Sequence, residues 1–140
     1  MPKIIRPSSS RSSFHSGNLS NACLRACAAG LATLDIYQRE GLFERAAALA
    51  PAFEAAVHGL RGRPGVIDIR NVGLMGAVEL APRKDAAGAR GYEVMVDCFN
   101  HGLYLGQSGD SLALSPPLIV ERSHIDEIVS ILGDVIKRVA

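Results

Sequence analysis

The sequence has almost no net charge, few cysteines and no long apolar run, and each shortage excludes a class of function. The formal net charge is +1 over 140 residues, so the charge balance indicates neither nucleic acid nor an acidic membrane surface as a partner. The apolar runs are far shorter than the ~20 residues that a membrane-spanning helix needs. Three cysteines without disulfide-like spacing suit a reducing compartment. These shortages predict a cytoplasmic protein.

Apart from these shortages, the composition is typical of one globular domain. Hydrophobic residues make up 48% of the chain and charged residues 21%, which is typical of a packed core with a solvated surface. Residues 1–13 differ, because they are rich in serine and contain no acidic residue, and their apolar pair is too short for a signal peptide. We expect residues 1–13 to form a disordered tail and residues 14–140 to form the domain.

The stretch Gly65–Leu80 (GVIDIRNVGLMGAVEL) is the predicted nucleus of a β-sheet. Its first half alternates apolar and charged residues with a period of two, which places Ile67 and Ile69 on one face of a strand. Its second half places Leu74, Gly76, Val78 and Leu80 on one face. The turn between the two strands is predicted at residues 71–73.

Helical periodicity surrounds this nucleus. Apolar residues at three- and four-residue spacing predict one helix over residues 22–40, with a stop at Gly41, and another over residues 42–60 with a kink or break at Pro51. A last helix is predicted from Ser123 as the N-cap, with Asp126 making a near capping box, to the end of the chain. A further helix before Gly102 is expected to bury Tyr92, Met95, Val96 and Phe99. Two more short strands are predicted at residues 103–105 and 111–114, with residues 106–110 as their turn, which Asp110 is expected to shape. Pro116 and Pro117 are expected to take the chain out of the sheet, because they lack ladder donors. The fold class is therefore α+β, with a small, mainly antiparallel sheet of three to four strands and helices on one face.

The cysteines and histidines form no recognisable catalytic motif. Cys23 and Cys27 are four residues apart and could in principle ligate a metal, but no second pair stands at zinc-site spacing. We therefore interpret them as packing thiols and predict no metal. The four histidines are interpreted as surface residues or neighbours of helix caps: His15, His58, His101 and His124.

Three strings occur in a familiar order. They are ACAAGL at Ala26–Leu31, the nucleus Val66–Leu80 followed by Ala81-Pro82-Arg83, and GDSLALSPPL at Gly109–Leu118. Together they make the chain, from about Phe14 to Ala140, resemble the C-terminal small domain of class III pyridoxal-phosphate aminotransferases of the ω-amino acid:pyruvate (β-alanine:pyruvate) type. The resemblance implies the small-domain fold of fold-type I enzymes, pyridoxal 5′-phosphate as cofactor, a large cofactor-binding domain as partner and a homodimer.

The chain departs from this family at the residue that holds the cofactor. The resemblance implies a Schiff base to a lysine of the large domain, whose amine must be uncharged. The three lysines here are Lys3, Lys84 and Lys137, and none matches the family's lysine motif. We therefore predict no catalytic residue in this chain, no cofactor bound by it alone and no transaminase activity.

A second departure concerns the loop that binds the cofactor phosphate in the partner subunit. The resemblance places this loop at residues 16–19, before the first helix, and makes Gly17, Asn18 and Leu19 the phosphate-binding positions. Leu19 stands where the family has a threonine and offers no hydrogen-bond donor. The family's His-Pro at the helix start is Cys23-Leu24 here. An altered leader before an intact domain is what a truncated or frameshifted gene would leave.

A third departure concerns substrate binding. The resemblance places an arginine that holds the substrate carboxylate at position 106, where this chain has Gly106 followed by Gln107. Gln107 can donate a hydrogen bond but carries no charge. The resemblance therefore makes Gly106 and Gln107 the substrate-binding positions and predicts an altered substrate preference.

Two hypotheses follow. In the first, the chain is the C-terminal portion of an aminotransferase. In the second, it is a stand-alone, non-catalytic module that pairs with a full-length homologue. The apolar side of the first helix would be left exposed in the isolated chain and would favour association.

Overall fold

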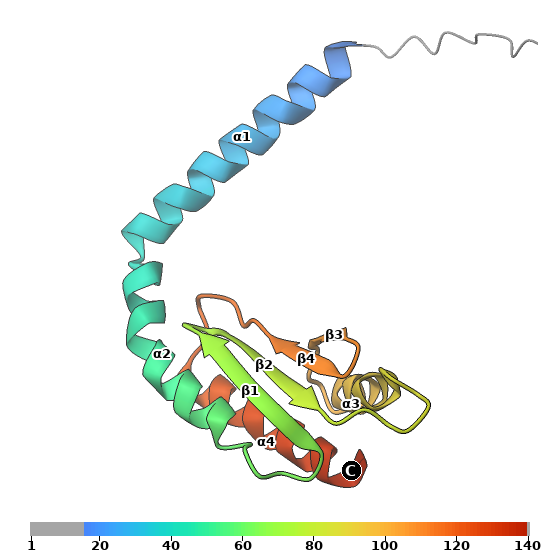
Figure 1. Ribbon diagram of the computed structural model, residues 1–140. Helices are drawn as coiled ribbons and strands as arrows, with labels where there is room; N and C mark the ends of the chain where they lie inside the picture. Colours follow the sequence, from blue (N-terminus) through green and yellow to red (C-terminus); the bar gives the residue numbers. More distant parts are fainter. Residues whose placement is uncertain (1–15, 140) are drawn as a thin grey trace, which may run out of the picture. The chain divides into compact units, whose positions relative to one another are not determined.

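The computed structural model describes the backbone of residues 16–139 and the side chains of residues 23–139. The chain divides into two compact units, Met1–Arg39 and Glu40–Ala140. The described part of the first unit is one helix, α1 (Ser16–Arg39). The second unit runs, in order, through α2 (Leu42–His58), β1 (Val66–Val72), β2 (Met75–Leu80), α3 (Ala89–Asn100), β3 (Gly106–Ser108), β4 (Ser111–Leu114) and α4 (Arg122–Val139) (Figure 1).

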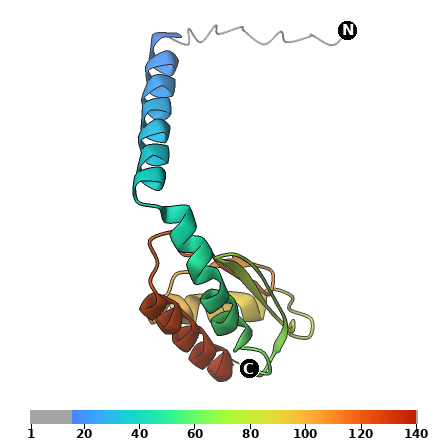
Figure 2. The same ribbon diagram turned by 90° about the vertical axis from the view of Figure 1, so that its left-hand side faces the viewer.

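The second unit is an antiparallel sheet with helices on one face, which confirms the predicted fold class. The strand order is β1-β2-β4-β3, and all three pairings are antiparallel. Val78 of β2 stands opposite Leu112 of β4, and both are fully buried on the helical side. A Cβ placed on Gly76 would meet the ring of Phe53 from α2 at 3.1 Å. The helices therefore pack closely on this face (Figure 2).

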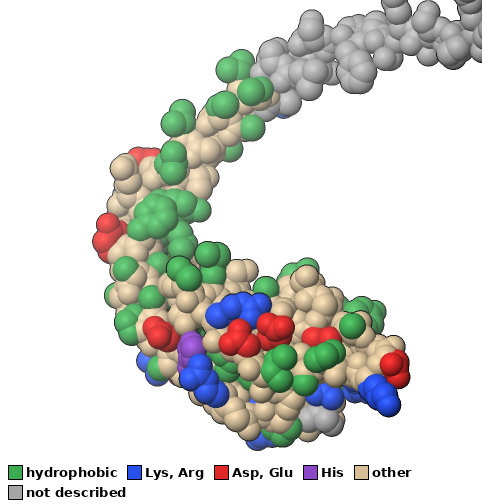
Figure 3. Space-filling view, viewed as in Figure 1, with side chains coloured by type: hydrophobic (Ala, Val, Ile, Leu, Met, Phe, Trp, Pro, Cys, Tyr) green, Lys and Arg blue, Asp and Glu red, His purple; other side chains and the backbone are tan. Residues whose placement is uncertain are grey.

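The other face of the sheet is open and carries charge. Arg70 of β1 donates to Asp68 at 2.7 Å and to Glu79 of β2 at 2.8 Å. Figure 3 shows acidic and basic side chains gathered over these two strands. Alternation of apolar and polar residues along the strands thus separates a core face from a solvated one.

The apolar stripes predicted for α2 and α4 are confirmed. Phe53 and Val57 of α2 and Ile125, Leu132 and Val135 of α4 have no exposed surface. The break predicted at Pro51 does not occur, since α2 is one helix from Leu42 to His58. The predicted stop after the first helix is also confirmed, since Gly41 adopts a left-handed conformation with φ 58°.

The hairpin of β1 and β2 differs from the prediction in two ways. The turn lies at Gly73-Leu74 rather than at residues 71–73, because Val72 still pairs with Met75. Gly73 has φ +56°, as the first position of a two-residue hairpin turn requires. A register shift between Val66 and Asp68 leaves Ile67 without a strand partner and 59% exposed. This bulge is why Ile67 and Ile69 do not share a face.

The buried face of α3 differs from the prediction in most of its residues. Tyr92, Val96 and Phe99 are exposed, and only Met95 packs against the core as predicted. The residues that the helix buries are Gly91, Val94 and Cys98. At Gly91 the helix approaches the β3–β4 turn so closely that a Cβ would collide with the carbonyl oxygen of Gly109 and lie 2.9 Å from the Cα of Asp110.

Candidate functional site

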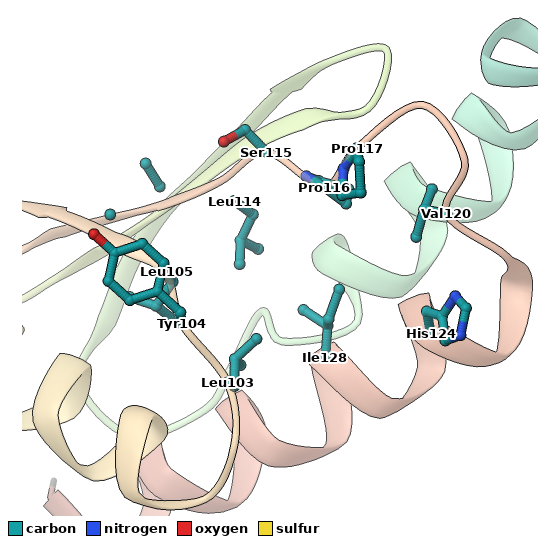
Figure 4. A pocket seen from close by; sticks show the side chains of 12 residues that line it. Leu103, Tyr104, Leu105, Leu114, Ser115, Pro116, Pro117, Val120, His124 and Ile128 are labelled. Carbon is teal, nitrogen blue, oxygen red and sulfur yellow. The ribbon is translucent and has the colours of Figure 1, made fainter. Parts of the chain in front are cut away.

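A cavity of about 450 Å³ lies beside the β3–β4 hairpin (Figure 4). One wall is the segment that leads into β3, with Leu103, Tyr104 and Leu105. The opposite wall is the segment that leaves β4, and α4 closes the base. The lining is mostly apolar and is completed by Gly106, Ala113, Leu114, Ser115, Pro116, Pro117, Val120, His124 and Ile128.

The wall after β4 is held in place by several contacts. The prediction that Pro116 and Pro117 leave the sheet is confirmed, since β4 ends at Leu114. The N–H of Val120 donates to the carbonyl of Pro117 at 2.9 Å. Arg45 of α2 donates to the carbonyl oxygens of Ile119 at 3.1 Å and Val120 at 3.2 Å. The cavity is therefore built by chain that other elements fix.

The opposite rim is positioned by an aromatic pair. The rings of Tyr104 and Phe99 meet edge to face, with centroids 6.5 Å apart and an interplanar angle of 81°. This is a favourable aromatic geometry, and it connects the cavity rim to α3. Tyr104 as a whole is 79% exposed.

His124 stands at the cavity and also caps α4. The backbone N–H of Glu121 donates to Nδ1 of His124 at 3.2 Å, and the N–H of Ile125 donates to the carbonyl of Glu121 at 3.1 Å. Glu121 is thus the N-cap, and the predictions that Ser123 caps the helix and that Asp126 completes a capping box are wrong. Asp126 pairs instead with Arg122 at 3.3 Å. The sequence signal was obscured because a histidine replaces the usual Glu or Gln of a capping box.

The two predicted substrate-binding positions lie next to this cavity. Gly106 lines it, and Gln107 follows on β3, paired with Leu112. The predicted turn over residues 106–110 is shorter in the structure, where β3 occupies Gly106–Ser108 and residues 103–105 are irregular. The amide of Gln107 donates to the carbonyl of Gly109 within the hairpin. Sequence reasoning identified Gly106 and Gln107 but missed Tyr104 and His124 as neighbours of one cavity, because these residues come from separate elements.

The three predicted phosphate-binding positions lie in the other compact unit. Gly17, Asn18 and Leu19 belong to α1, which begins at Ser16, so the predicted loop at residues 16–19 is helical instead. Their side chains are outside the part of the chain that the structure describes, as are His15 and the predicted tail at residues 1–13. The phosphate-binding role remains a prediction.

Asp110 caps α3 from the β3–β4 turn. Its Oδ2 accepts from the N–H of Gly88 at 2.7 Å and its Oδ1 accepts from the N–H of Gly91 at 3.0 Å. These two hydrogen bonds hold the pKa of the Asp110 carboxyl below its usual value, with a smaller contribution in the same direction from Arg90. The turn role predicted for this residue thus extends to joining the hairpin to α3.

The cysteines divide by exposure. Cys23 and Cys27 are exposed on α1, so their interpretation as packing thiols is wrong, whereas Cys98 is fully buried. Within residues 23–139, no three side chains of His, Cys, Asp or Glu come together as a metal site. No helix in the described part of the chain is long and apolar enough to cross a membrane.

The residues described here do not fit pyridoxal phosphate as a covalently held cofactor. Lys84 lies exposed in the loop before α3, and Lys137 of α4 is exposed and faces Asp134 at 3.5 Å. Neither has the desolvated site that lowers the pKa of a Schiff-base lysine. Lys3 lies outside the described residues. We therefore derive no chemical step from this cofactor.

Comparison with known proteins gives consistent results. Residues 3–136 match the family described as Aminotransferase class-III. The omega-aminotransferase of Caulobacter vibrioides is 47% identical over 114 residues, which are 81% of this chain and 26% of that protein. The beta-alanine–pyruvate aminotransferase of Pseudomonas aeruginosa is 40% identical over 115 residues, which are 82% of this chain and 26% of that protein.

Solved transaminase structures share the fold. A co-factor free transaminase superposes with a TM-score of 0.75 at 28% identity, covering 81% of this chain and 28% of that one. A thermostable omega transaminase 6-fold mutant from Pseudomonas jessenii superposes with a TM-score of 0.72 at 30% identity, covering 76% and 25%. The chain therefore spans about a quarter of the length of these relatives.

Proposed function

Because the chain belongs to the class III aminotransferase family, we propose that it is the C-terminal portion of a pyridoxal-phosphate-dependent enzyme. That enzyme transfers an amino group from an ω-amino acid or amine to pyruvate. The proposal is supported by relatives whose names include omega-aminotransferase and beta-alanine–pyruvate aminotransferase. In it, the large cofactor-binding domain is the partner of this chain, and two such enzymes form a homodimer.

The chain alone has no transaminase activity in this proposal. The observation that carries this point is the position of Lys84 and Lys137, which are surface residues rather than buried amines. A Schiff base requires an uncharged amine, which a desolvated site favours, and neither exposed side chain has such a site. The activity is therefore expected only when a large domain supplies the lysine.

The test is an assay of the purified chain with pyridoxal phosphate, β-alanine and pyruvate, in which alanine is measured. We expect no alanine, and no lysine carrying the cofactor after borohydride reduction and mass spectrometry. A full-length relative, the Caulobacter vibrioides omega-aminotransferase, serves as the positive control. Alanine formed by the chain alone would contradict the proposal, and substitution of Lys84 and Lys137 by Ala would locate the amine responsible.

One observation bears on the choice between the two hypotheses, because a fragment is expected to expose an apolar surface and a stand-alone module that pairs with a full-length homologue is not. On α1, Leu24, Leu31 and Leu34 are 68%, 70% and 56% exposed. Their three- and seven-residue spacing places them on one side of the helix, and Figure 3 shows hydrophobic side chains along it. An exposed apolar stripe of this kind favours association with another protein surface.

Sedimentation of the full chain tests this association. We expect self-association that is lost in the double variant Leu31→Glu, Leu34→Glu and retained in the double variant Ala29→Glu, Ala32→Glu, which places the same charge on exposed positions away from the stripe. A wild-type chain that stays monomeric at high concentration would favour the stand-alone module over the fragment.

A further inference from the structure

Two thiols stand on the same side of the helix α1. Cys23 and Cys27 both lie inside this helix, which runs from Ser16 to Arg39 (Figure 1). Four residues advance an α-helix by one turn and about 40°, so the two side chains lie one above the other. Both are exposed, and packing in a core therefore does not account for them.

The helix keeps these two thiols too far apart for a disulfide. Residues four apart on a helix have Cβ atoms ~5–6 Å apart, whereas the Cβ atoms of a disulfide are ~3.5–4.5 Å apart. A metal ion between the sulfurs adds two metal–sulfur bonds of ~2.3 Å each, which allow sulfur atoms up to about 4.6 Å apart. The pair therefore fits a bridging ion but not a direct bond while the helix is intact.

The surroundings of the pair decide which ion fits. Between Leu19 and Leu31 the sequence has no His, Asp or Glu, and the third cysteine, Cys98, is fully buried on α3. Structural zinc takes four ligands, and calcium and magnesium take six or more oxygen atoms, so none of these ions fits. Two thiolates without further ligands suit a soft ion of low coordination number, which among the metals of the cell is Cu(I).

The pair also has the space and the charge that this ion requires. A Cβ placed on Gly30, three residues after Cys27, would meet no atom within 4 Å, so this side of α1 is open. A Cu(I) ion with two thiolates carries one negative charge in total. The one charged residue between Leu19 and Leu31 is Arg25, which is basic and therefore attracts such a complex.

We propose that Cys23 and Cys27 form a two-coordinate site for Cu(I) on α1. Two sulfur–copper bonds form, the two S–H protons go to the solvent, and the copper stays in its +1 state throughout. This inference does not rest on the proposed function, because it involves neither the cofactor nor amino transfer.

The test is a competition for Cu(I) between the reduced full chain and bicinchoninate in the absence of oxygen. The chain is kept at a concentration at which sedimentation shows a monomer, and the absorbance of the copper–bicinchoninate complex is followed. We expect the chain to withdraw one ion per molecule and to remain monomeric with copper bound. Zn(II), offered with a zinc-binding dye, is expected to stay with the dye. X-ray absorption is expected to show two sulfur neighbours at the copper.

Two variants separate the spacing of the thiols from their number. Cys27→Ala leaves one thiol on α1 and should bind Cu(I) about 100-fold more weakly, as loss of one of two linked contacts does. The double variant Cys27→Ala, Ala28→Cys keeps two thiols on α1, at positions that are exposed, but turns them about 140° apart around the helix. It should bind as weakly as Cys27→Ala. Cys98→Ala removes only the buried thiol and should bind like the wild type.

Four outcomes would overturn the proposal. They are no withdrawal of copper by the folded wild type, equal withdrawal by the wild type and the double variant, one copper per two chains with copper-dependent association, and withdrawal of zinc from its dye. Circular dichroism of each variant confirms the helix, so that unfolding is not mistaken for loss of binding. Failure of this test leaves the transaminase proposal intact, because that proposal is tested by alanine formation.

Discussion

At the scale of single residues, two of the three thiols of this chain are exposed to solvent and the third is buried. Burial raises the pKa of the Cys98 thiol to about 11, and the nearby Asp97 carboxylate acts in the same direction, while Arg138 opposes both. Cys23 and Cys27 are exposed. Since the thiolate is the reactive form, exposure and pKa both make Cys98 the unreactive cysteine.

We expect a thiol reagent at mildly alkaline pH to modify two cysteines of the native chain rapidly and the third only after unfolding. The number of thiols that react in each phase is measured by absorbance, and the modified residues are identified by mass spectrometry. Cys98→Ala should react at two sites in both states. Rapid modification of Cys98 in the folded wild type would contradict the burial described here.

Gly91 packs so closely against the β3–β4 turn that no side chain fits at this position. A Cβ there would lie 2.9 Å from the Cα of Asp110 and would collide with the carbonyl oxygen of Gly109, and both are backbone atoms that cannot rotate away. We expect Gly91→Ala to lower the free energy of unfolding by about 1–3 kcal/mol, as overpacking does. Urea unfolding measures this loss.

Gly30→Ala is the matched control for that change. It adds the same methyl group to a helix, but no atom lies within 4 Å of the added Cβ. Because alanine also has the higher helix propensity, this variant should not destabilise the sheet domain. Equal destabilisation by both variants would show that packing at Gly91 is not the cause.

At the scale of elements, α3 is joined to the β3–β4 hairpin through Asp110. Its carboxylate satisfies the N–H groups of Gly88 and Gly91 at the start of the helix, a site where negative charge is stabilising. Gly88 and Asp110 are 22 positions apart in sequence. The contact between α3 and the hairpin therefore depends on one side chain.

We expect Asp110→Asn to cost about 0.5–1 kcal/mol of stability at neutral pH, and less in acid, because the amide keeps one oxygen for two N–H groups and loses the negative charge at the start of the helix. Folding lowers the pKa of Asp110, so the folded protein binds the proton more weakly than the unfolded chain. The stabilisation is therefore complete above the unfolded pKa of about 4 and is lost as the pH falls through the lower folded pKa.

Urea unfolding of both proteins across this pH range checks the prediction. The difference between wild type and Asp110→Asn should shrink as the pH is lowered. Asp134→Asn, an exposed carboxylate of α4 that faces Lys137, is the control and should change stability by a few tenths of a kcal/mol. A difference that stays constant down to acid pH would contradict the role of the Asp110 carboxylate.

At the scale of the whole molecule, the buried core of the described residues lies entirely between Leu42 and Val139. It belongs to the unit Glu40–Ala140, while the described part of the other unit is the helix α1. The core includes side chains from β1, β2 and β4 and from α2, α3 and α4. The second unit therefore has what a domain needs to fold by itself.

We expect residues 40–140, expressed alone, to unfold cooperatively with the same urea midpoint as the full chain. Circular dichroism should show the loss of helix that corresponds to α1 and no loss of strand. A fragment of residues 60–140, which lacks α2, removes Phe53 and Val57 from the core and should fail to unfold cooperatively. A lowered midpoint for residues 40–140 would show that the first unit stabilises the second.

The sequence alone determined the elements whose signals are local. The stripes of α2 and α4, the stop at Gly41 and the departure of Pro116 and Pro117 from the sheet follow from spacing and backbone chemistry near each residue. The α+β class follows from the same periodicities, and the family resemblance from the order of three strings. These properties need no knowledge of which segments meet.

Tertiary contacts decided the rest. The bulge at Ile67 arises from pairing with β2, and α3 buries Gly91 because Gly109 and Asp110 leave no room for a side chain there. The cavity exists only where segments around β3, β4 and α4 come together. Local patterns cannot encode these features, because each depends on atoms that are distant in sequence and adjacent in space.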